Sequence, residues 1–336
     1  MGFDLPRKGK VLIRADASWV IGAGHVMRTL ALGQLLSEAG YEVHFATIPH
    51  DPTILDLLNQ EGFNVHCFRQ DTVWSASSDL GSFLSLASQV QPAWVVLDGY
   101  HLDHDYERAV KRSGCKLLRI DDLPAGHYYA DVVLNQNYGA ETFKYEREPY
   151  TQVLAGLRYA LLRREFRKVV SFDRPIRTSR PLQLLVSLGG SSEKTDVLNF
   201  TIAQGLSGLS VKDVSVTFLV GALGRNMAEE MSKADMAIVS GGSTMWELIY
   251  MNVPFMAVAL NEMQRDYLQM LSAHGICVDL GRHEYLTIAG VRQSALDFIQ
   301  DHEGRMRMSN QFKPLMDRRN IGRDLLGIMD GRTAWV

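Results

Sequence analysis

Short apolar runs alternate with helical segments along the first half of the chain. The runs, which read as strands, lie at residues 10–16, 42–47, 64–68, 93–100, 115–123 and 131–137. After Gly24 the residues Val26, Leu30, Leu32, Leu35 and Leu36 predict a helix with a buried face. Gly40 suits the end of that helix, and Asp51 with Pro52 suits the start of another, over 51–62. Strands alternating with helices predict an α/β fold with a parallel sheet.

The second half repeats this rhythm after a basic, proline-interrupted stretch at 163–181. We expect strands near 182–188, 214–221 and 235–240, and the last clear strand at 253–260. The interval from 220 to 236 leaves room for one short crossover helix, near 225–234. Length and this repetition predict two α/β domains, at 1–165 and 181–315. We expect residues 316–336 to form a tail, helical and crossing back to the first domain.

Composition narrows the class of protein. The 336 residues are 46% hydrophobic and carry a formal net charge of −3, so we expect a folded protein that binds no nucleic acid. Cys67, Cys115 and Cys277 are far apart, which predicts reduced, buried thiols. No apolar run is long enough for a membrane helix, and the first ten residues lack the apolar core of a signal peptide. We therefore expect a cytoplasmic location and no membrane partner.

Three glycine-rich turns each join a strand to a helix, at 22–25, 188–192 and 240–244. Unpaired N–H groups at a helix N-terminus attract anions, and glycine lets a phosphate approach them. The turns lack the Lys-Ser/Thr pair of a Walker A loop. "GAGHVM" also lacks the third glycine of a dinucleotide site, which argues against NAD. In "SGGSTMWEL", Ser243 and Glu247 share one helical face and suit a diphosphate and a ribose, although Glu247 can also simply complement the helix dipole.

His25 stands where the first of these helices begins. The positive end of the helix dipole disfavours a charged imidazole, so we expect a mostly neutral ring, the form a general base needs. Arg28 shares the face of His25 and is a candidate phosphate ligand. The alternative is a capping or core histidine. The remaining histidines lack metal-ligand spacing, "HLDHD" (101–105) reads as a polar loop and helix start, and we expect neither metal nor cofactor.

Polar residues cluster at the carboxyl ends of the predicted strands, where ligands of such sheets bind. These residues are Asp16, Asp98, Tyr100, Asp121, Asp122, Asn135 and Asn137.

An ordered set of motifs resembles one family. The motifs are "RADASWVIGAGHVMRTLALGQLL", "VVLDGYHLD", "RIDDL", "DVVLNQNYGA", "YALLRREF", "LVSLGG", "ADMAIVSGGSTMWEL" and "VALNEMQ", within residues 10–285. They resemble the nucleotide-sugar hydrolase of pseudaminic acid biosynthesis, which removes UDP from UDP-2,4-diacetamido-2,4,6-trideoxy-β-L-altropyranose. The resemblance implies a GT-B fold, with two Rossmann-like domains facing a cleft. That fold is similar to the N-acetylglucosaminyl transferase that makes lipid II.

The resemblance also implies roles for particular residues. His25 would activate the water that attacks the anomeric carbon, with inversion and C–O cleavage, and no metal is needed. Tyr100 and Asn261 match active-site residues, Arg163 matches a family arginine, and Ser243 with Glu247 matches the UDP-binding turn. The predicted catalytic residues are His25, Tyr100 and Asn261, and the predicted substrate-binding residues are Gly22, Gly24, Arg28, Asp98, Arg163, Gly190, Gly242, Ser243, Thr244, Glu247 and Gln264.

Two departures from the family pattern bear on this hypothesis. Family members have Asn-Gln where this chain has Asn261-Glu262, with Gln264 two places later. They also carry a helix and a strand that the short 220–236 interval omits, and in GT-B proteins the end of that strand helps to hold uracil. Two other functions stay open: a glycosyltransferase that uses a UDP-sugar, and an inactive nucleotide-sugar-binding relative. We expect a UDP-sugar as ligand and a monomer.

Overall fold

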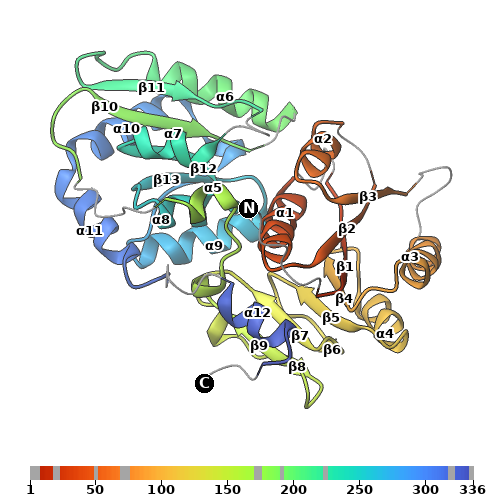
Figure 1. The fold of residues 1–336 in the computed structure, drawn as a ribbon. Coiled ribbons are helices and arrows are strands. Elements are labelled where there is room, and N and C mark those ends of the chain that lie inside the picture. Colours follow the sequence, from red (N-terminus) through yellow and green to blue (C-terminus); the bar gives the residue numbers. More distant parts are fainter. Residues whose placement is uncertain are drawn as a thin grey trace, which may run out of the picture. The chain divides into compact units, whose positions relative to one another are not determined.

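The structure is a computed structural model. It describes residues 8–17, 23–48, 52–68, 76–169, 176–189, 193–221, 226–316 and 322–332. The chain divides into two compact units, one comprising Met1–Arg164 with Asp317–Val336 and the other Glu165–Met316 (Figure 1). Each unit is described by itself below.

The first unit is built on a seven-stranded parallel sheet in the order β3-β2-β1-β4-β5-β7-β9. Its strands are β1 Lys10–Ala15, β2 Glu42–Thr47, β3 Asn64–Cys67, β4 Trp94–Asp98, β5 Lys116–Ile120, β7 Val132–Asn135 and β9 Gln152–Ala155. A small two-stranded sheet pairs β6 His127–Tyr128 with β8 Glu146–Arg147. The helices are α1 Gly24–Glu38, α2 Pro52–Gln60, α3 Ala76–Val90, α4 His104–Arg112 and α12 Arg323–Met329, with 3₁₀ turns at Ala140–Thr142 and Leu157–Tyr159.

The second unit has a five-stranded parallel sheet in the order β11-β10-β12-β13-β14. Its strands are β10 Leu182–Ser187, β11 Val214–Phe218, β12 Met236–Ser240, β13 Phe255–Ala259 and β14 Val278–Arg282. The helices are α6 Glu193–Leu206, α7 Met227–Lys233, α8 Thr244–Tyr250, α9 Glu262–Ala273, α10 Ile288–Gln300 and α11 His302–Phe312. A 3₁₀ turn lies at His283–Tyr285, and the short helix α5, Arg164–Arg167, spans the boundary between the units.

Helix α1 shows how the sequence places the residues of interest. Its apolar residues Val26, Leu30, Leu32 and Leu36 are almost completely buried. Gly40 follows the helix with φ +96° and ends it, because this left-handed conformation favours glycine. The helix begins at Gly24, and His25 lies at the carboxyl edge of the sheet, because its side chain contacts Asp98, the last residue of β4.

The strand orders define one switch point in each unit. In the first, β1 is followed by crossovers to β2 on one side and to β4 on the other. In the second, β10 lies between β11 and β12. Ligands of doubly wound α/β sheets bind at the carboxyl edge beside such a point, because the connecting loops leave in opposite directions there. The α1 turn and the end of β4 flank the first switch point, and the two later glycine turns flank the second.

Most of the predicted elements are confirmed, including the crossover helix α7. Residues 253–260, the last clear strand of the prediction, contain β13, but the prediction missed β14, which pairs in parallel with β13. β14 is half-buried along its whole length and contains Asp279, Gly281 and Arg282, so it has no apolar run. The prediction also missed β9, a four-residue edge strand. All three cysteines are free, but Cys67 is exposed and not buried as expected.

The last helix packs on the first unit. The Trp94 indole N–H donates to the carbonyl of Met329 at 3.2 Å, and Lys8 forms an ion pair with Asp330 at 2.7 Å. Among the described residues, none of the helices has both the length and the apolar character to cross a bilayer.

Close packing of α6 against α10 gives a stability prediction for the second unit. A Cβ atom at Gly205 would come within 2.6 Å of Val291 Cγ1 and 3.0 Å of the Ile288 carbonyl oxygen. We expect Gly205→Ala to lower the free energy of unfolding by about 1–3 kcal/mol, measured by urea denaturation, because the helices must separate.

Gly81→Ala in α3 is the matched control, since a Cβ there meets nothing within 4 Å in the described part of the chain. It should stabilise the protein by about 0.5–1 kcal/mol through helix propensity alone. Equal effects of the two substitutions would contradict the close packing.

Candidate active site

His25 is held by a carboxylate at the end of β4. Its Nδ1 lies 2.7 Å from Oδ1 of Asp98, and both residues are buried. An ionised carboxylate only accepts hydrogen bonds, so Nδ1 carries a proton, and Nε2 is the ring atom left to accept one. Within the described residues Nε2 has no hydrogen-bond partner in the structure. This pairing of a histidine with a buried aspartate prepares the ring to accept a proton.

Arg28, one turn along α1, completes the support. Its Nε and Nη2 donate to the two oxygens of Asp98, both at 2.6 Å, and its Nη1 donates to Oδ1 of Asp122 at 2.6 Å. Arg28 is buried, and all three of its nitrogens are occupied. The guanidinium therefore joins the ends of β4 and β5.

Tyr100 forms the exposed side of the cluster. Its hydroxyl donates to Oδ2 of Asp122 at 2.9 Å, and its ring meets the His25 ring edge-on, with centroids 4.8 Å apart. The residue is 55% exposed. Gly99, just before it, allows a close approach, because a Cβ there would meet the His101 ring at 2.8 Å.

Charge and burial set the protonation of these groups. Burial alone would raise the pKa of Asp98, but the charge of Arg28 and the contact with His25 hold that pKa well below its ordinary value. The pKa of Asp122 is also lowered, because the charge of Arg28 outweighs burial. Burial and the negative charge of Asp122 raise the pKa of Tyr100. At neutral pH the two carboxyls are ionised and the phenol is protonated.

Two predicted roles do not fit this geometry. Asp98 was expected to contact the substrate, but it is fully buried and both of its oxygens are engaged. Arg28 was expected to hold a phosphate, but its nitrogens already bind Asp98 and Asp122. The sequence placed Asp98 at the carboxyl edge and Arg28 on the helical face of His25, but it could not show that the two side chains face each other. They position His25.

The predicted nucleotide turn of the second unit lies between β12 and α8. Ser243 is the residue before the helix, and its side chain makes no capping hydrogen bond. Cβ atoms built on Gly189 and on Gly242 would each have Ser240 Oγ as their nearest neighbour, at 3.9 Å. The turns after β10 and β12 therefore lie side by side. Ser243, Thr244 and Glu247 are all half-buried.

Asn261 and Gln264 have a local structural role. The Asn261 side chain accepts from the N–H of Gln264 at 2.9 Å, and the Gln264 side chain accepts from the N–H of Leu260 at 2.8 Å. The Asn261 side chain therefore caps the start of α9, and Gln264 reaches back to the residue before the cap. A Cβ at Gly241 would come within 3.1 Å of the Gln264 side chain, so α9 begins beside the nucleotide turn.

The remaining predicted residues are dispersed. Arg163 is buried in the first unit, and Gly24, the first residue of α1, has no atom within 4 Å of a Cβ built on it, among the residues described. Gly22 and Gly190 lie outside the described residues.

Sequence reasoning placed Asp122 and Asn137 at the sheet edge but gave them no role. Asn137 Nδ2 donates to Oδ1 of Asp122 at 2.9 Å, and Asn135 Nδ2 donates to the Asp122 backbone carbonyl at 3.0 Å. Asp122 thus accepts hydrogen bonds from α1, from the residues after β4 and from the end of β7. The two consecutive acids in "RIDDL", directly after a buried strand, were the signal that could have identified it.

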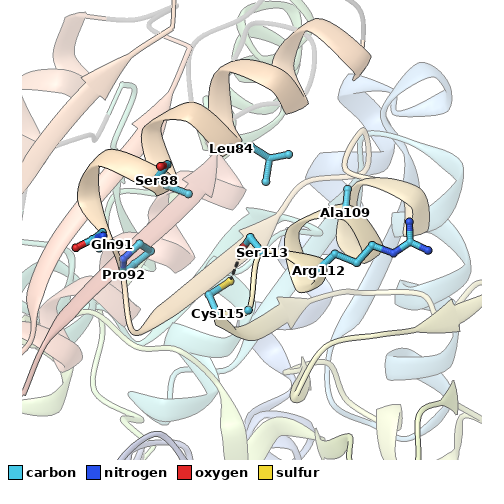
Figure 2. A pocket seen from close by; sticks show the side chains of 10 residues that line it. Leu84, Ser88, Gln91, Pro92, Ala109, Arg112, Ser113 and Cys115 are labelled. Carbon is cyan, nitrogen blue, oxygen red and sulfur yellow. Dashed lines mark hydrogen bonds between the residues drawn. The ribbon is translucent and has the colours of Figure 1, made fainter.

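A pocket of about 640 Å³ lies elsewhere in the first unit, between α3 and α4 (Figure 2). Its lining includes Pro92 and Cys115, which precede β4 and β5, so it sits at the amino edge of the sheet. None of the predicted site residues lines it. In the described part of the chain no group of three or more His, Cys, Asp or Glu side chains could hold a metal ion.

The chain has distant relatives among known proteins. It is 24% identical over 291 residues to the UDP-2,4-diacetamido-2,4,6-trideoxy-beta-L-altropyranose hydrolase of Campylobacter jejuni, a match that covers 80% of this chain and 98% of that one. It is 27% identical to an uncharacterised protein of Methanocaldococcus jannaschii over 78% of this chain, which spans only 59% of that relative. The spore coat polysaccharide biosynthesis protein SpsG of Bacillus subtilis is 24% identical over 57% of this chain and 62% of its own length. No protein-family profile matches.

Solved structures identify the class of fold. MurG of Acinetobacter baumannii superposes with a TM-score of 0.65 at 16% identity, over 97% of this chain and 100% of that chain. The spinosyn rhamnosyltransferase SpnG, complexed with thymidine diphosphate, gives 0.62 at 14% identity, over 94% of this chain and 99% of that chain. The chain therefore has a GT-B-like fold, α/β with two Rossmann-like domains. Of the three relatives given above, the Campylobacter protein is named as a hydrolase of a UDP-sugar.

Proposed function

We propose that the chain is a nucleotide-sugar hydrolase that removes UDP from UDP-2,4-diacetamido-2,4,6-trideoxy-β-L-altropyranose. The observation that carries this proposal is the 2.7 Å contact between His25 Nδ1 and Asp98, which leaves Nε2 as a base. The similarity to the Campylobacter hydrolase over nearly its whole length supports the choice of substrate. We further propose that the enzyme works in pseudaminic acid biosynthesis, in the cytoplasm, as a monomer and without a metal.

The reaction follows from the state of the His25 ring. A water oxygen attacks the anomeric carbon while Nε2 of His25 takes one of its protons. The bond between that carbon and the β-phosphate oxygen breaks, and its electron pair leaves with UDP. Attack opposite the leaving group inverts the anomeric configuration. Asp98 stabilises the imidazolium that forms, as in other histidine–aspartate pairs.

The leaving diphosphate needs stabilisation because negative charge builds on it in the transition state. We assign UDP binding to the turn at Gly242, Ser243 and Thr244, with Glu247 accepting from the ribose hydroxyls. Gly189, which follows β10 and lies beside Ser240, is a further candidate for contact with the diphosphate. Arg163 remains our candidate for a cationic contact with the substrate.

The test is incubation with the UDP-sugar and no acceptor. Stoichiometric release of UDP and free sugar, followed by NMR or chromatography, is the expected result. If the substrate stays intact and calorimetry still detects UDP binding, the protein is an inactive nucleotide-sugar-binding protein and not a hydrolase.

A glycosyltransferase is the second candidate, because the solved structures that superpose with the chain include several glycosyltransferases. The same base would then deprotonate an acceptor hydroxyl. UDP release that depends on an added acceptor, with the sugar found on that acceptor, would favour transfer over hydrolysis.

Substitutions at Asn261 separate its capping role from its proposed catalytic role. Asn261→Asp keeps the oxygen that accepts from Gln264 N–H, so the stability should change little, but it removes the amide donor. If that amide contacts the substrate, turnover falls about tenfold or more, the value of a lost hydrogen bond in the transition state.

Asn261→Ala removes both functions and should cost a further ~1 kcal/mol of unfolding free energy. Steady-state kinetics and thermal unfolding check the pair. Full turnover in Asn261→Asp would confine Asn261 to capping.

A further inference from the structure

We propose that Asp122 is a positioning residue that fixes the Tyr100 hydroxyl as a hydrogen-bond acceptor for the attacking water. This inference rests on the proposed hydrolase function. It begins from the hydroxyl, which donates its single proton to Asp122 Oδ2 at 2.9 Å. What this oxygen offers to a ligand is therefore a lone pair. The Tyr100 side chain is 55% exposed.

Asp122 is held firmly enough to impose this direction. Arg28 Nη1 and Asn137 Nδ2 both donate to Oδ1, which leaves Oδ2 to the tyrosine. The Asp122 backbone is fixed as well, since its N–H donates to Asp121 Oδ1 at 2.8 Å and its carbonyl accepts from Asn135. The carboxyl is ionised and cannot donate a proton to Tyr100 in return.

Tyr100 also lies against the base. Its ring packs edge-on against the His25 ring, with an interplanar angle of 82°. Two acceptors, His25 Nε2 and Tyr100 Oη, can each take one hydrogen of the same water. A water bound through both hydrogens must direct a lone pair at its remaining neighbour, the anomeric carbon. Tyr100 would thus orient the nucleophile while His25 takes the proton.

A double-mutant cycle of Tyr100→Phe and Asp122→Asn tests this role, with kcat and KM measured for each variant. Tyr100→Phe should lower kcat about tenfold with KM nearly unchanged, because the lost contact is to water and not to the sugar. Asp122→Asn should lower kcat by a similar factor, because an amide can donate to the hydroxyl and reverse its direction. The double variant should also lose about tenfold and not a hundredfold, since both changes remove one interaction.

A neighbouring pair provides the matched control. The Tyr128 hydroxyl donates to Asp121 Oδ2 at 2.8 Å, one residue from Asp122. Tyr128→Phe breaks this equivalent tyrosine–aspartate bond and leaves Asp121 Oδ1 on the Asp122 N–H, so kcat should stay within about twofold of the wild type. Additive losses at Tyr100 and Asp122, or an effect on KM alone, would overturn the inference.

A second readout works whether or not the proposed function is correct. The ¹³Cζ resonance of Tyr100, assigned by its loss in Tyr100→Phe, should shift in Asp122→Asn and stay unchanged in Tyr128→Phe. An unshifted resonance in Asp122→Asn would overturn the positioning role. Wild-type protein that hydrolyses no UDP-sugar, with the resonance shifting as expected, would instead reject the hydrolase and leave the Asp122–Tyr100 contact intact.

Discussion

His25→Asn should lower kcat by about 10²–10⁴-fold while UDP still binds with near wild-type affinity. The asparagine amide can still donate to Asp98, so the buried carboxylate keeps a partner, but the basic nitrogen is gone. UDP affinity should persist because we assign nucleotide binding to the turn before α8. Steady-state kinetics and calorimetric titration with UDP measure the two effects separately.

His127→Asn is the matched control for that substitution. His127 also pairs with a carboxylate in the first unit, through Nε2 and Glu148 at 3.1 Å, but its side chain is 41% exposed. We assign His127 no part in the reaction, so its replacement should leave kcat unchanged. Equal rates for His25→Asn and the wild type would reject His25 as the base.

Asp98→Asn should have the largest combined effect on rate and stability. The amide N–H₂ must replace one carboxylate oxygen, and either orientation sets it against an N–H of Arg28. In one orientation it also faces Nδ1 of His25 and favours the tautomer that carries its proton on Nε2. We expect kcat to fall on the order of 10³–10⁴-fold, as for other buried aspartates that hold a histidine base.

The same variant should lose about 3–5 kcal/mol of unfolding free energy at neutral pH, because the Arg28 charge stays buried with one carboxylate fewer. The lowered pKa of Asp98 in the folded state fixes the pH dependence. Its contribution is complete above the ordinary carboxyl pKa of about 3.9 and is lost as pH falls from there toward the folded value. Urea unfolding should show a smaller difference in unfolding free energy between Asp98→Asn and the wild type at pH 3 than at pH 7.

Asp131→Asn is the control that separates the loss of stability from the loss of kcat. Asp131 binds Lys111 at 2.6 Å and Lys116 at 2.9 Å, just before β7, and its pKa is also lowered, since these contacts outweigh burial. Its replacement should destabilise the protein and leave kcat unchanged. A stability difference for Asp98→Asn that is independent of pH would contradict the ionised, buried carboxylate.

Much of the fold was predictable because buried parallel strands are nearly continuous apolar runs. β4 and β12 are buried at every position, and the sequence identifies both. Edge strands are harder to predict in this way. They pair with a neighbouring strand on one side only, and they tolerate polar residues. β14 lies at the end of its sheet, is only half-buried and carries Arg282, so its pattern resembles a loop.

The sequence predicted that the site lies at the carboxyl edge of the sheet, but it did not predict which side chains contact each other there. Local signals, a glycine turn before a helix and acids after strands, located His25 and Asp98 at one edge. Their contact joins residues 73 positions apart and depends on the order β1-β4 in the sheet, which no local pattern encodes. For the same reason Arg28 was assigned to a phosphate, although it lies against Asp98 and Asp122 and is buried with them.

Hydrolysis of the UDP-sugar in ¹⁸O-enriched water tests the central claim most directly. If water activated by His25 attacks the anomeric carbon, mass spectrometry will find the label in the C1 hydroxyl of the released sugar and none in UDP. Label in the β-phosphate of UDP would mean that water attacks phosphorus, and the account of His25 and its water would then be wrong.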